Sequence, residues 1–430
     1  MERPTLDPRL RLVEQADLKE KVVLIRVDHN VVKNGKIKDP YRIDATFGTL
    51  YTVVEMGGRP ILLTHVGRPR DKATGNISCD EEQSVAPIAA YLRQKLGVRI
   101  HIPEFPIAPD KGILHIGEAI LPAIEDLKAG KTSILYLPNS RWFQGEQSKG
   151  PDRAVFAAEL AGIADIFVND AFGSWQPHVS TYDIAKCMPS YAGPLLRKEI
   201  ENLYAALEPE RPFLAIVAGA KYDTKIGPVK ALYERVDHMI LGGLMYNTFL
   251  CAKYGIRIGG VSEEDCRLAA ELVKQDREMG KIIELPYLVE TDNIGPKAKK
   301  TYRTRSLEKL KEKGSGGHIL DVAPQSLKTE VIEDVIRSAR TIFTNAVMGF
   351  MPDFFEGSRA LYEAISSNDS ALKLFGGGDT LEALKTLCPG VYLKGLDAPD
   401  TYYFTGGGSV LAALEQGSPY LLKPVEALMQ

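Results

Sequence analysis

Features that define several classes of protein are missing from this chain of 430 residues. No apolar run approaches the ~20 residues that a membrane-spanning helix needs. The net charge is only −3, so no overall field would draw the protein to nucleic acid or to a membrane surface. The segment Met1–Asp7 lacks the apolar stretch of a signal peptide. We therefore expect a cytoplasmic protein that binds neither nucleic acid nor membranes.

Cysteine is scarce and scattered. The five cysteines are odd in number, and no two of them form a C-x-x-C pair. This pattern fits a reducing compartment better than a disulfide scaffold, and it provides no zinc-binding spacing. The cysteines are Cys79, Cys187, Cys251, Cys266 and Cys388.

Apolar runs alternate with helical segments along the whole chain. Such alternation predicts an α/β fold with parallel sheets, and the length predicts two domains. A long amphipathic helix beginning near Tyr191 ends at about Leu207, and Glu208–Pro212 then forms a proline-rich break. We place the domain boundary along this helix and break. The expected strands include 22–25, 60–63, 134–137 and 166–168 in the first half, and 213–217, 238–241, 282–285, 341–343 and 372–375 in the second.

The stretch from Leu372 to Leu384 reads as a short strand, three glycines and the start of a helix. Glycines leave backbone N–H groups open to a ligand, and a helix N-terminus attracts phosphate. Asp379 and Thr380 suit the first helical turn, and the Asp379 carboxylate can hold a metal ion that bridges phosphate oxygens. This pattern indicates a nucleotide phosphate site, although a tight strand-to-helix turn without a ligand would look the same.

Cationic side chains follow the predicted strands of the first half. In open α/β sheets the carboxyl ends of the strands share one edge, where ligands bind. Arginine matches phosphate and carboxylate groups with two parallel hydrogen bonds. The pattern therefore predicts a local anion site, although each arginine alone could belong to a surface ion pair. The residues are Arg26, Arg42, His65, Arg68 and Arg141.

The second half places glycines after its strands, where the first half places arginines. Glycines let a base and a phosphate chain lie against the backbone, whereas arginines bind a small anion. We therefore expect a nucleotide on one domain, an anionic acceptor on the other, and closure of the cleft between them.

Eight separate motifs resemble those of the phosphoglycerate kinase family in order and spacing. The chain is similar to this family over nearly its whole length, and it lacks the Gly-x-x-x-x-Gly-Lys-[Ser/Thr] motif that this family does not use. The motifs are Arg26-Val27-Asp28-His29-Asn30, Thr64-His65-Val66-Gly67-Arg68-Pro69, Asn139-Ser140-Arg141, Asn169-Asp170-Ala171-Phe172-Gly173, Gly219-Ala220-Lys221 with Lys225-Ile226-Gly227, Asn345 with Met348-Gly349, Gly376-Gly377-Gly378-Asp379-Thr380 and Thr405-Gly406-Gly407-Gly408.

The resemblance implies two Rossmann-like domains with parallel sheets, joined by a helix and separated by a cleft. It implies an acid-binding domain at 1–188, a connecting helix at 189–208, a nucleotide-binding domain at 209–405, and a tail at 406–430 that returns to the first domain. The implied enzyme is a monomeric, magnesium-dependent kinase of glycolysis. It transfers a phosphoryl group reversibly between ATP or ADP and the carboxylate of 3-phosphoglycerate.

The resemblance also implies roles for individual residues. The implied catalytic residues are Arg42, Lys221 and Gly378. The implied acid-binding residues are Arg26, Asp28, Asn30, Arg42, His65, Arg68, Arg141 and His178. The implied nucleotide-binding residues are Gly219, Ala220, Lys221, Lys225, Gly243, Asn345, Gly376, Gly377, Gly378, Asp379 and Thr380, with Asp379 on Mg²⁺.

The chain departs from the family pattern inside the predicted site. The segment Ser174–His178 replaces a usual stretch that contains an arginine, so one cation of the anion site is missing. His29 stands where the family usually has phenylalanine, and Leu244 fills a usual glycine position. Two alternatives follow: a related kinase that forms an acyl phosphate on another carboxylic acid, or a nucleotide-binding protein without turnover.

Overall fold

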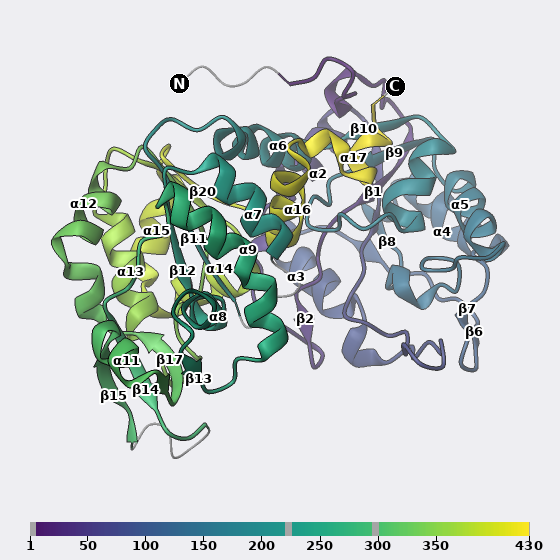
Figure 1. The fold of residues 1–430 in the computed structure, drawn as a ribbon. Coiled ribbons are helices and arrows are strands. Elements are labelled where there is room, and N and C mark those ends of the chain that lie inside the picture. Colours follow the sequence, from purple (N-terminus) through teal and green to yellow (C-terminus); the bar gives the residue numbers. More distant parts are fainter. Residues whose placement is uncertain (1–5, 220–225, 295–300, 430) are drawn as a thin grey trace. The chain divides into compact units, whose positions relative to one another are not determined.

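The computed structural model describes residues 6–219, 226–294 and 301–429 (Figure 1). Contacts divide the chain into two compact units. The first unit contains the described residues up to Glu201 together with those from Pro419 onward, and the second contains those between Asn202 and Ser418. Each unit is described by itself.

The first unit is built on a six-stranded sheet in the order β10-β9-β1-β4-β8-β5, in which every neighbouring pair is parallel. Its strands are β1 Val22–Arg26, β4 Arg59–Leu63, β5 Ile100–His101, β8 Ile134–Tyr136, β9 Ile166–Asn169 and β10 Ser190–Ala192. Two hairpins, β2 Val32–Lys33 with β3 Lys36–Ile37 and β6 Ile107–Ala108 with β7 Gly112–Ile113, lie outside this sheet. The helices are α1 Tyr41–Asp44, α2 Phe47–Glu55, α3 Ala86–Leu96, α4 Leu121–Lys128, α5 Asp152–Gly162, the first part of α6 Pro194–Leu207, and α17 Lys423–Glu426.

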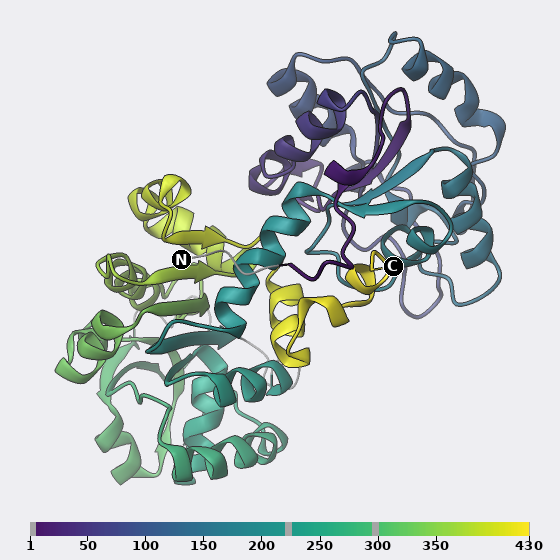
Figure 2. The same cartoon turned by 90° about the horizontal axis from the view of Figure 1, so that it is seen from above.

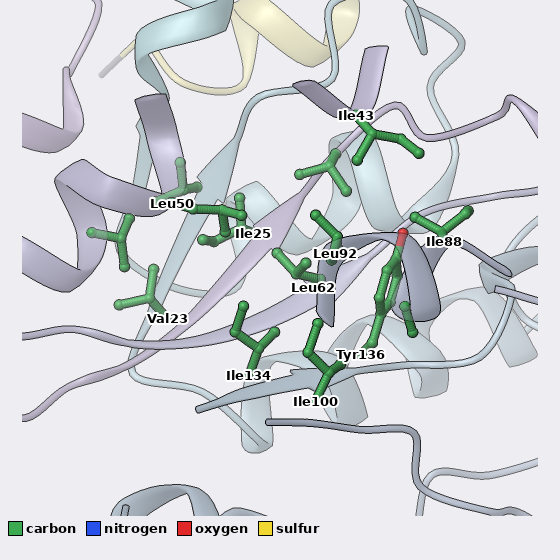
Figure 3. Packing of buried hydrophobic residues seen from close by; sticks show 14 of the residues in the cluster. Val23, Ile25, Ile43, Leu50, Leu62, Ile88, Leu92, Ile100, Ile134 and Tyr136 are labelled. Carbon is green, nitrogen blue, oxygen red and sulfur yellow. The ribbon is translucent and has the colours of Figure 1, made fainter. Parts of the chain in front are cut away.

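The apolar runs of the first half form buried strands, as expected for a parallel sheet. All five residues of β1 are buried. Side chains of β1, β4 and β8 pack against the apolar faces of α2 and α3, with Leu62 and Leu92 among the contacts (Figure 3). This packing fixes the position of each strand along its own axis. It therefore fixes where the carboxyl ends of the strands form an edge of the sheet.

The second unit has a five-stranded parallel sheet in the order β12-β11-β18-β19-β20, flanked by helices in both ribbon views (Figures 1 and 2). Its strands are β11 Phe213–Gly219, β12 His238–Gly242, β18 Thr341–Asn345, β19 Leu372–Phe375 and β20 Thr401–Tyr403. Its helices are α7 Ile226–Arg235, α8 Gly243–Tyr254, α9 Glu263–Met279, α11 Leu307–Lys313, α12 Glu330–Ser338, α13 Glu356–Ser366, α14 Gly378–Leu387, α15 Pro389–Asp397 and α16 Gly407–Gln416. The predicted α/β class with parallel sheets is confirmed.

One expected strand is wrong. The stretch 282–285 forms only an isolated bridge, between Ile282 and Met239. The strand here is β14 Tyr287–Thr291, which pairs antiparallel with β15 Arg303–Ser306 and β17 His318–Val322. A further short pair joins β13 Arg257–Ile258 to β16 Ser315–Gly316. A stretch of four residues, of which three are apolar and one is Glu284, is too short to specify a strand by its pattern alone.

The helix expected from Tyr191 begins at Pro194, because Ser190–Ala192 forms β10. Across the three described ranges, every helix is too short or too polar to cross a lipid bilayer.

Asp170, which directly follows β9, caps the N-terminus of α6. Its Oδ1 accepts hydrogen bonds from the N–H groups of Leu195 and Leu196 at 3.0 and 3.1 Å, and its Oδ2 accepts one from the Thr49 hydroxyl. A Cβ on Gly193 would lie 2.2 Å from this carboxylate, so only glycine fits there. Burial raises the pKa of Asp170 to about 6, against the opposing effect of these hydrogen bonds.

This raised pKa predicts a pH dependence of stability. A carboxyl whose pKa is higher in the folded than in the unfolded state contributes stability below its ordinary pKa of 3.8, and that contribution is lost as the pH rises through about 6. The loss should be about 3 kcal/mol. Asp170→Asn keeps the shape and offers an oxygen to Leu195 and Leu196, so it should remove this loss between pH 4 and pH 7.

The measurement is urea unfolding followed by tryptophan fluorescence, because both tryptophans, Trp142 and Trp175, lie in the first unit. Asp110→Asn, at an exposed position of the same unit, is the matched control. Equal pH slopes for Asp170→Asn and the control would contradict the assignment.

Candidate active site

The first unit brings its predicted cations to one sheet edge. In the strand register Arg26 pairs with Leu63 of β4 and with Asn169 of β9, so the loops that follow these strands begin side by side. Asn139 ties two of the loops together: its amide nitrogen donates to the carbonyl of Val66 at 2.7 Å, and its oxygen accepts from the N–H of Val66 at 3.0 Å. The edge is thus set by backbone pairing and by a buried amide.

His65 lies at the centre of these cations. Arg26 Nη2 lies 3.0 Å from His65 Nδ1, and because arginine only donates, Nδ1 is the acceptor. Burial and the positive charges of Arg141 and Arg26 hold the pKa of His65 well below its ordinary 6.5. His65 is therefore neutral with its proton on Nε2, which makes it an N–H donor for an anion.

Arg26 itself is only 1% exposed, so in this arrangement it lies behind His65 and does not present a free guanidinium. Its Nε donates to Ser180 Oγ at 2.9 Å and its Nη1 donates to the carbonyl of Val27. The more accessible groups are Arg68, which is exposed, and Arg42, which pairs with Asp28 at 3.2 Å.

The remaining predicted acid-binding residues lie in the same loops. Arg141 donates to the carbonyl of Gly67, and the N–H of Gly67 donates to Asn30 Oδ1 at 2.9 Å. His178 is half-buried with its Nε2 3.4 Å from Gln147 Nε2, and burial lowers its pKa. The segment before His178 is held by Arg153 of α5, which donates to the carbonyl of Pro177 at 2.6 Å.

Glu146 was not predicted from the sequence, yet it is the buried anion behind this edge. It is 0% exposed and accepts hydrogen bonds from Ser180 Oγ at 2.6 Å, Ser180 N at 2.9 Å and Ser140 Oγ at 3.1 Å. Its charge raises the pKa of Arg26 and of Arg141, in opposition to the effect of burial. Because Glu146 stands in a polar stretch after Arg141, nothing in the sequence distinguishes it from a surface carboxylate.

The second unit brings its predicted glycine loops to one edge as well. Gly377 has φ +102°, and a Cβ there would lie 3.0 Å from Asn345 Nδ2. A Cβ on Gly407 would lie 2.4 Å from the Cα of Gly377. Three loops, at the ends of β18, β19 and β20, therefore meet at close range with bare backbone between them.

Helix α14 begins at Gly378 and carries Asp379, exposed, and Thr380, buried, in its first turn. Nearby, Gly219 and Gly243 form an isolated parallel bridge. An apolar pocket beside Gly243 is lined by residues including Leu285, Ile319 and Met348. The predicted residues Ala220, Lys221 and Lys225 lie outside the described residues.

Asp379 lies in surroundings that bear on metal binding. Among the described residues, no three His, Cys, Asp or Glu side chains are grouped to hold a metal ion by themselves. Magnesium in nucleotide sites uses one or two carboxylates together with phosphate oxygens and water. An exposed carboxylate in the first turn of α14 fits that role.

Similarity to known proteins identifies the family of this chain. The family model described as phosphoglycerate kinase matches residues 13–417. The chain belongs to the phosphoglycerate kinase family. The predicted resemblance is thus confirmed.

Phosphoglycerate kinases among the curated relatives match over nearly their full lengths. The protein of Dictyoglomus turgidum is 35% identical over 407 residues, which cover 93% of this chain and 94% of the relative. That of Chlamydia trachomatis is 35% identical over 416 residues, covering 94% and 96%. The family comprises phosphotransferases that act on a carboxylate and use ATP or ADP as co-substrate.

Solved phosphoglycerate kinase structures share the fold. That of Coxiella burnetii aligns with a TM-score of 0.74 and 28% identity, covering 97% of this chain and 98% of the other. That of Pyrococcus horikoshii aligns with a TM-score of 0.73 and 23% identity over the same shares, and supports the fold alone. These neighbours agree with the prediction of two Rossmann-like domains.

The buried anion predicts a large loss of stability on its neutralisation. Removing one partner of a buried charge pair costs about 3–5 kcal/mol, because the other charge is left uncompensated. Glu146→Gln should therefore lower the free energy of unfolding of the first unit by about 3 kcal/mol, measured by urea unfolding with tryptophan fluorescence.

Glu125→Gln is the control, because Glu125 is an exposed carboxylate of the same unit. If the two variants unfold at the same urea concentration, Glu146 is not the compensating charge.

Proposed function

We propose that this protein catalyses reversible phosphoryl transfer from ATP to the carboxylate of 3-phosphoglycerate, giving 1,3-bisphosphoglycerate. In this member of the phosphoglycerate kinase family, Arg42 and Arg141 lie close enough to a neutral His65 to lower its pKa, and Arg68 acts in the same way on Arg141; this gathering of cations carries the proposal. A small acid with several negative charges suits this edge, since arginine forks match both carboxylate and phosphate oxygens.

The two units have different proposed roles. The first unit, with the predicted domain 1–188, binds the acid through Asp28, Asn30, Arg42, His65, Arg68, Arg141 and His178, with Arg26 behind them. The second, with the predicted domain 209–405, binds the nucleotide through Gly219, Gly243, Asn345, Gly376–Thr380 and the predicted Ala220, Lys221 and Lys225. Its base would lie in the apolar pocket beside Gly243.

The chemistry requires position and charge rather than a general base. A carboxylate acceptor is already ionised at neutral pH, and phosphoryl transfer depends on in-line alignment and on neutralising the moving group. Arg42 would hold the acceptor, and the N–H groups at the start of α14, with Lys221, would hold the nucleotide phosphates. Mg²⁺, when bound through Asp379, supplies additional positive charge at the phosphate oxygens.

The cellular setting is part of the same proposal. We place the reaction in glycolysis in the cytoplasm, which agrees with free thiols at all five cysteines. We also propose that the enzyme acts as a monomer.

The deciding experiment is a coupled assay of the full chain with ATP, Mg²⁺ and 3-phosphoglycerate. Arg68→Gln should raise the KM for the acid by about ten- to a hundredfold, which corresponds to one lost charged hydrogen bond of roughly 1.5–3 kcal/mol. The KM for ATP should not change, because Arg68 belongs to the other unit.

Arg99→Gln is the matched control, since Arg99 is exposed but precedes β5 and so lies at the opposite end of a strand.

A second candidate function, a kinase for another carboxylic acid, is favoured by the absence of arginine in Ser174–His178. Turnover of another acid from a panel but not of 3-phosphoglycerate would select it. ATP binding without turnover of any acid would leave only nucleotide binding.

The metal role of Asp379 has its own test. Asp379→Asn removes the charge and keeps the shape, so the Mg²⁺ concentration for half-maximal activity should rise by about tenfold or more. The measurement is activity against Mg²⁺ at constant ATP. Asp397→Asn, exposed at the end of α15, serves as the control and should leave this concentration unchanged.

A further inference from the structure

His29 stands between two predicted acid-binding residues, yet its side chain turns away from them. Asp28 and Asn30 serve the sheet edge, through contacts with Arg42 and with the N–H of Gly67. His29 is 0% exposed and lies against Tyr136 of β8, with the two rings in a T-shaped arrangement and their centroids 6.1 Å apart. Figure 3 shows Tyr136 within the core of the first unit, its hydroxyl oxygen directed toward the side of Ile43 and Ile88.

Both ring nitrogens of His29 have partners. Nε2 lies 3.0 Å from Thr46 Oγ1, and Nδ1 lies 2.8 Å from Tyr136 Oη. The single hydroxyl proton of Thr46 goes to the carbonyl of Ile43 at 2.7 Å, so Thr46 must accept from His29. The proton of His29 is therefore on Nε2, and Tyr136 donates to Nδ1.

The network contains no net charge. Burial, with the nearby charge of Arg26, lowers the pKa of His29 to about 3, and burial raises that of Tyr136 well above 10. The imidazole stays neutral across the physiological range, so its hydrogen-bond pattern does not change with pH there. A neutral, fully paired polar network in a core fixes geometry rather than adding charge.

The network reaches the helical turn that carries Arg42. Ile43, whose carbonyl accepts from Thr46, is the next residue, and the turn α1 ends at Asp44. Thr46 is also the residue from which α2 starts. On the other side, the backbone N–H of His29 donates to Thr64 Oγ1 at 2.9 Å, which joins the strand end before His65 to the same network.

We propose that His29 is a positioning residue that fixes the Arg42 turn against the strand ends of the first unit, and so sets the affinity for the anionic acid. The inference rests on the proposed function, because it assigns Arg42 to the acid. Phenylalanine at this position would offer no donor for Thr46 and no acceptor for Tyr136. In this chain the turn is held by hydrogen bonds.

Each hydrogen-bonding side chain of the network is replaced singly in the full-length protein. His29→Phe and Thr46→Val both remove the hydrogen bond between His29 Nε2 and Thr46 Oγ1. Each should raise the KM for 3-phosphoglycerate by about tenfold, with the KM for ATP unchanged. Thr46→Ser keeps the hydroxyl and should behave as the wild type does. Tyr136→Phe removes only the other partner of His29, so it should lower the unfolding midpoint without changing the KM for the acid.

Two readouts do not depend on turnover. Hydrogen exchange of backbone amides at 41–47 should be faster in His29→Phe and Thr46→Val than in the wild type and in Tyr136→Phe. Binding of 3-phosphoglycerate, followed by the fluorescence of Trp142 and Trp175, should weaken in the same two variants. If the wild type shows no turnover of 3-phosphoglycerate, the proposed function fails, while exchange and binding still judge the role of His29.

The outcomes are separable. Wild-type exchange at 41–47 and wild-type affinity in both His29→Phe and Thr46→Val would overturn the proposal. A lower unfolding midpoint alone, without the change in exchange or affinity, would assign His29 to core packing and would also overturn it.

Discussion

A permanent cation buried in the first unit is the constraint on which the proposed acid-binding edge depends. The guanidinium of Arg26 cannot lose its proton at any ordinary pH, and its desolvation must be offset by nearby groups. Glu146 supplies the compensating negative charge, and Ser180 connects the two residues by hydrogen bonds. With Arg26 held in this way, an N–H of its Nη2 donates to His65 Nδ1 and fixes the tautomer of His65. The geometry of the more accessible cations thus depends on two charges buried behind them.

The edge proposed for the nucleotide is organised by the opposite means. Where the first unit places charged side chains after its strands, the second places glycines. Gly377, Gly407 and Asn345 approach so closely that a Cβ at either glycine would meet its neighbours within about 3 Å. Backbone N–H groups are the ligands that remain, and phosphate is the anion that suits them. The two edges therefore differ in their ligand chemistry, although both stand at the carboxyl ends of parallel strands.

Most of the fold could be predicted from the sequence, and the reasons are local. Strands such as β1 and β11 are continuous apolar runs, and the glycines before α14 mark a strand-to-helix turn. The expected strand at 282–285 was wrong because so short a stretch does not specify strand partners. The antiparallel pairing of β14 with β15 and β17 depends on contacts distant in the sequence.

The candidate site was predictable to a similar extent. Cations after strand ends were visible in the sequence because parallel strands share an edge. The burial of Glu146 and the orientation of the His29 side chain toward the core were not visible in the sequence. Both depend on residues such as Ser180 and Tyr136, which are distant in the sequence. The depth of Arg26 was also invisible, since the sequence gives its place at the end of β1 but not the loops that cover it.

The contact between Gly407 and Gly377 has a consequence for how the protein tolerates change. A methyl group on Gly407 would need the space that the Cα of Gly377 occupies, and a methyl group on Gly377 would press against the Asn345 amide at 3.0 Å. A side chain at either position therefore requires a neighbouring loop to shift. Rigidity at this edge thus results from close packing of backbone that carries no side chains, rather than from additional hydrogen bonds.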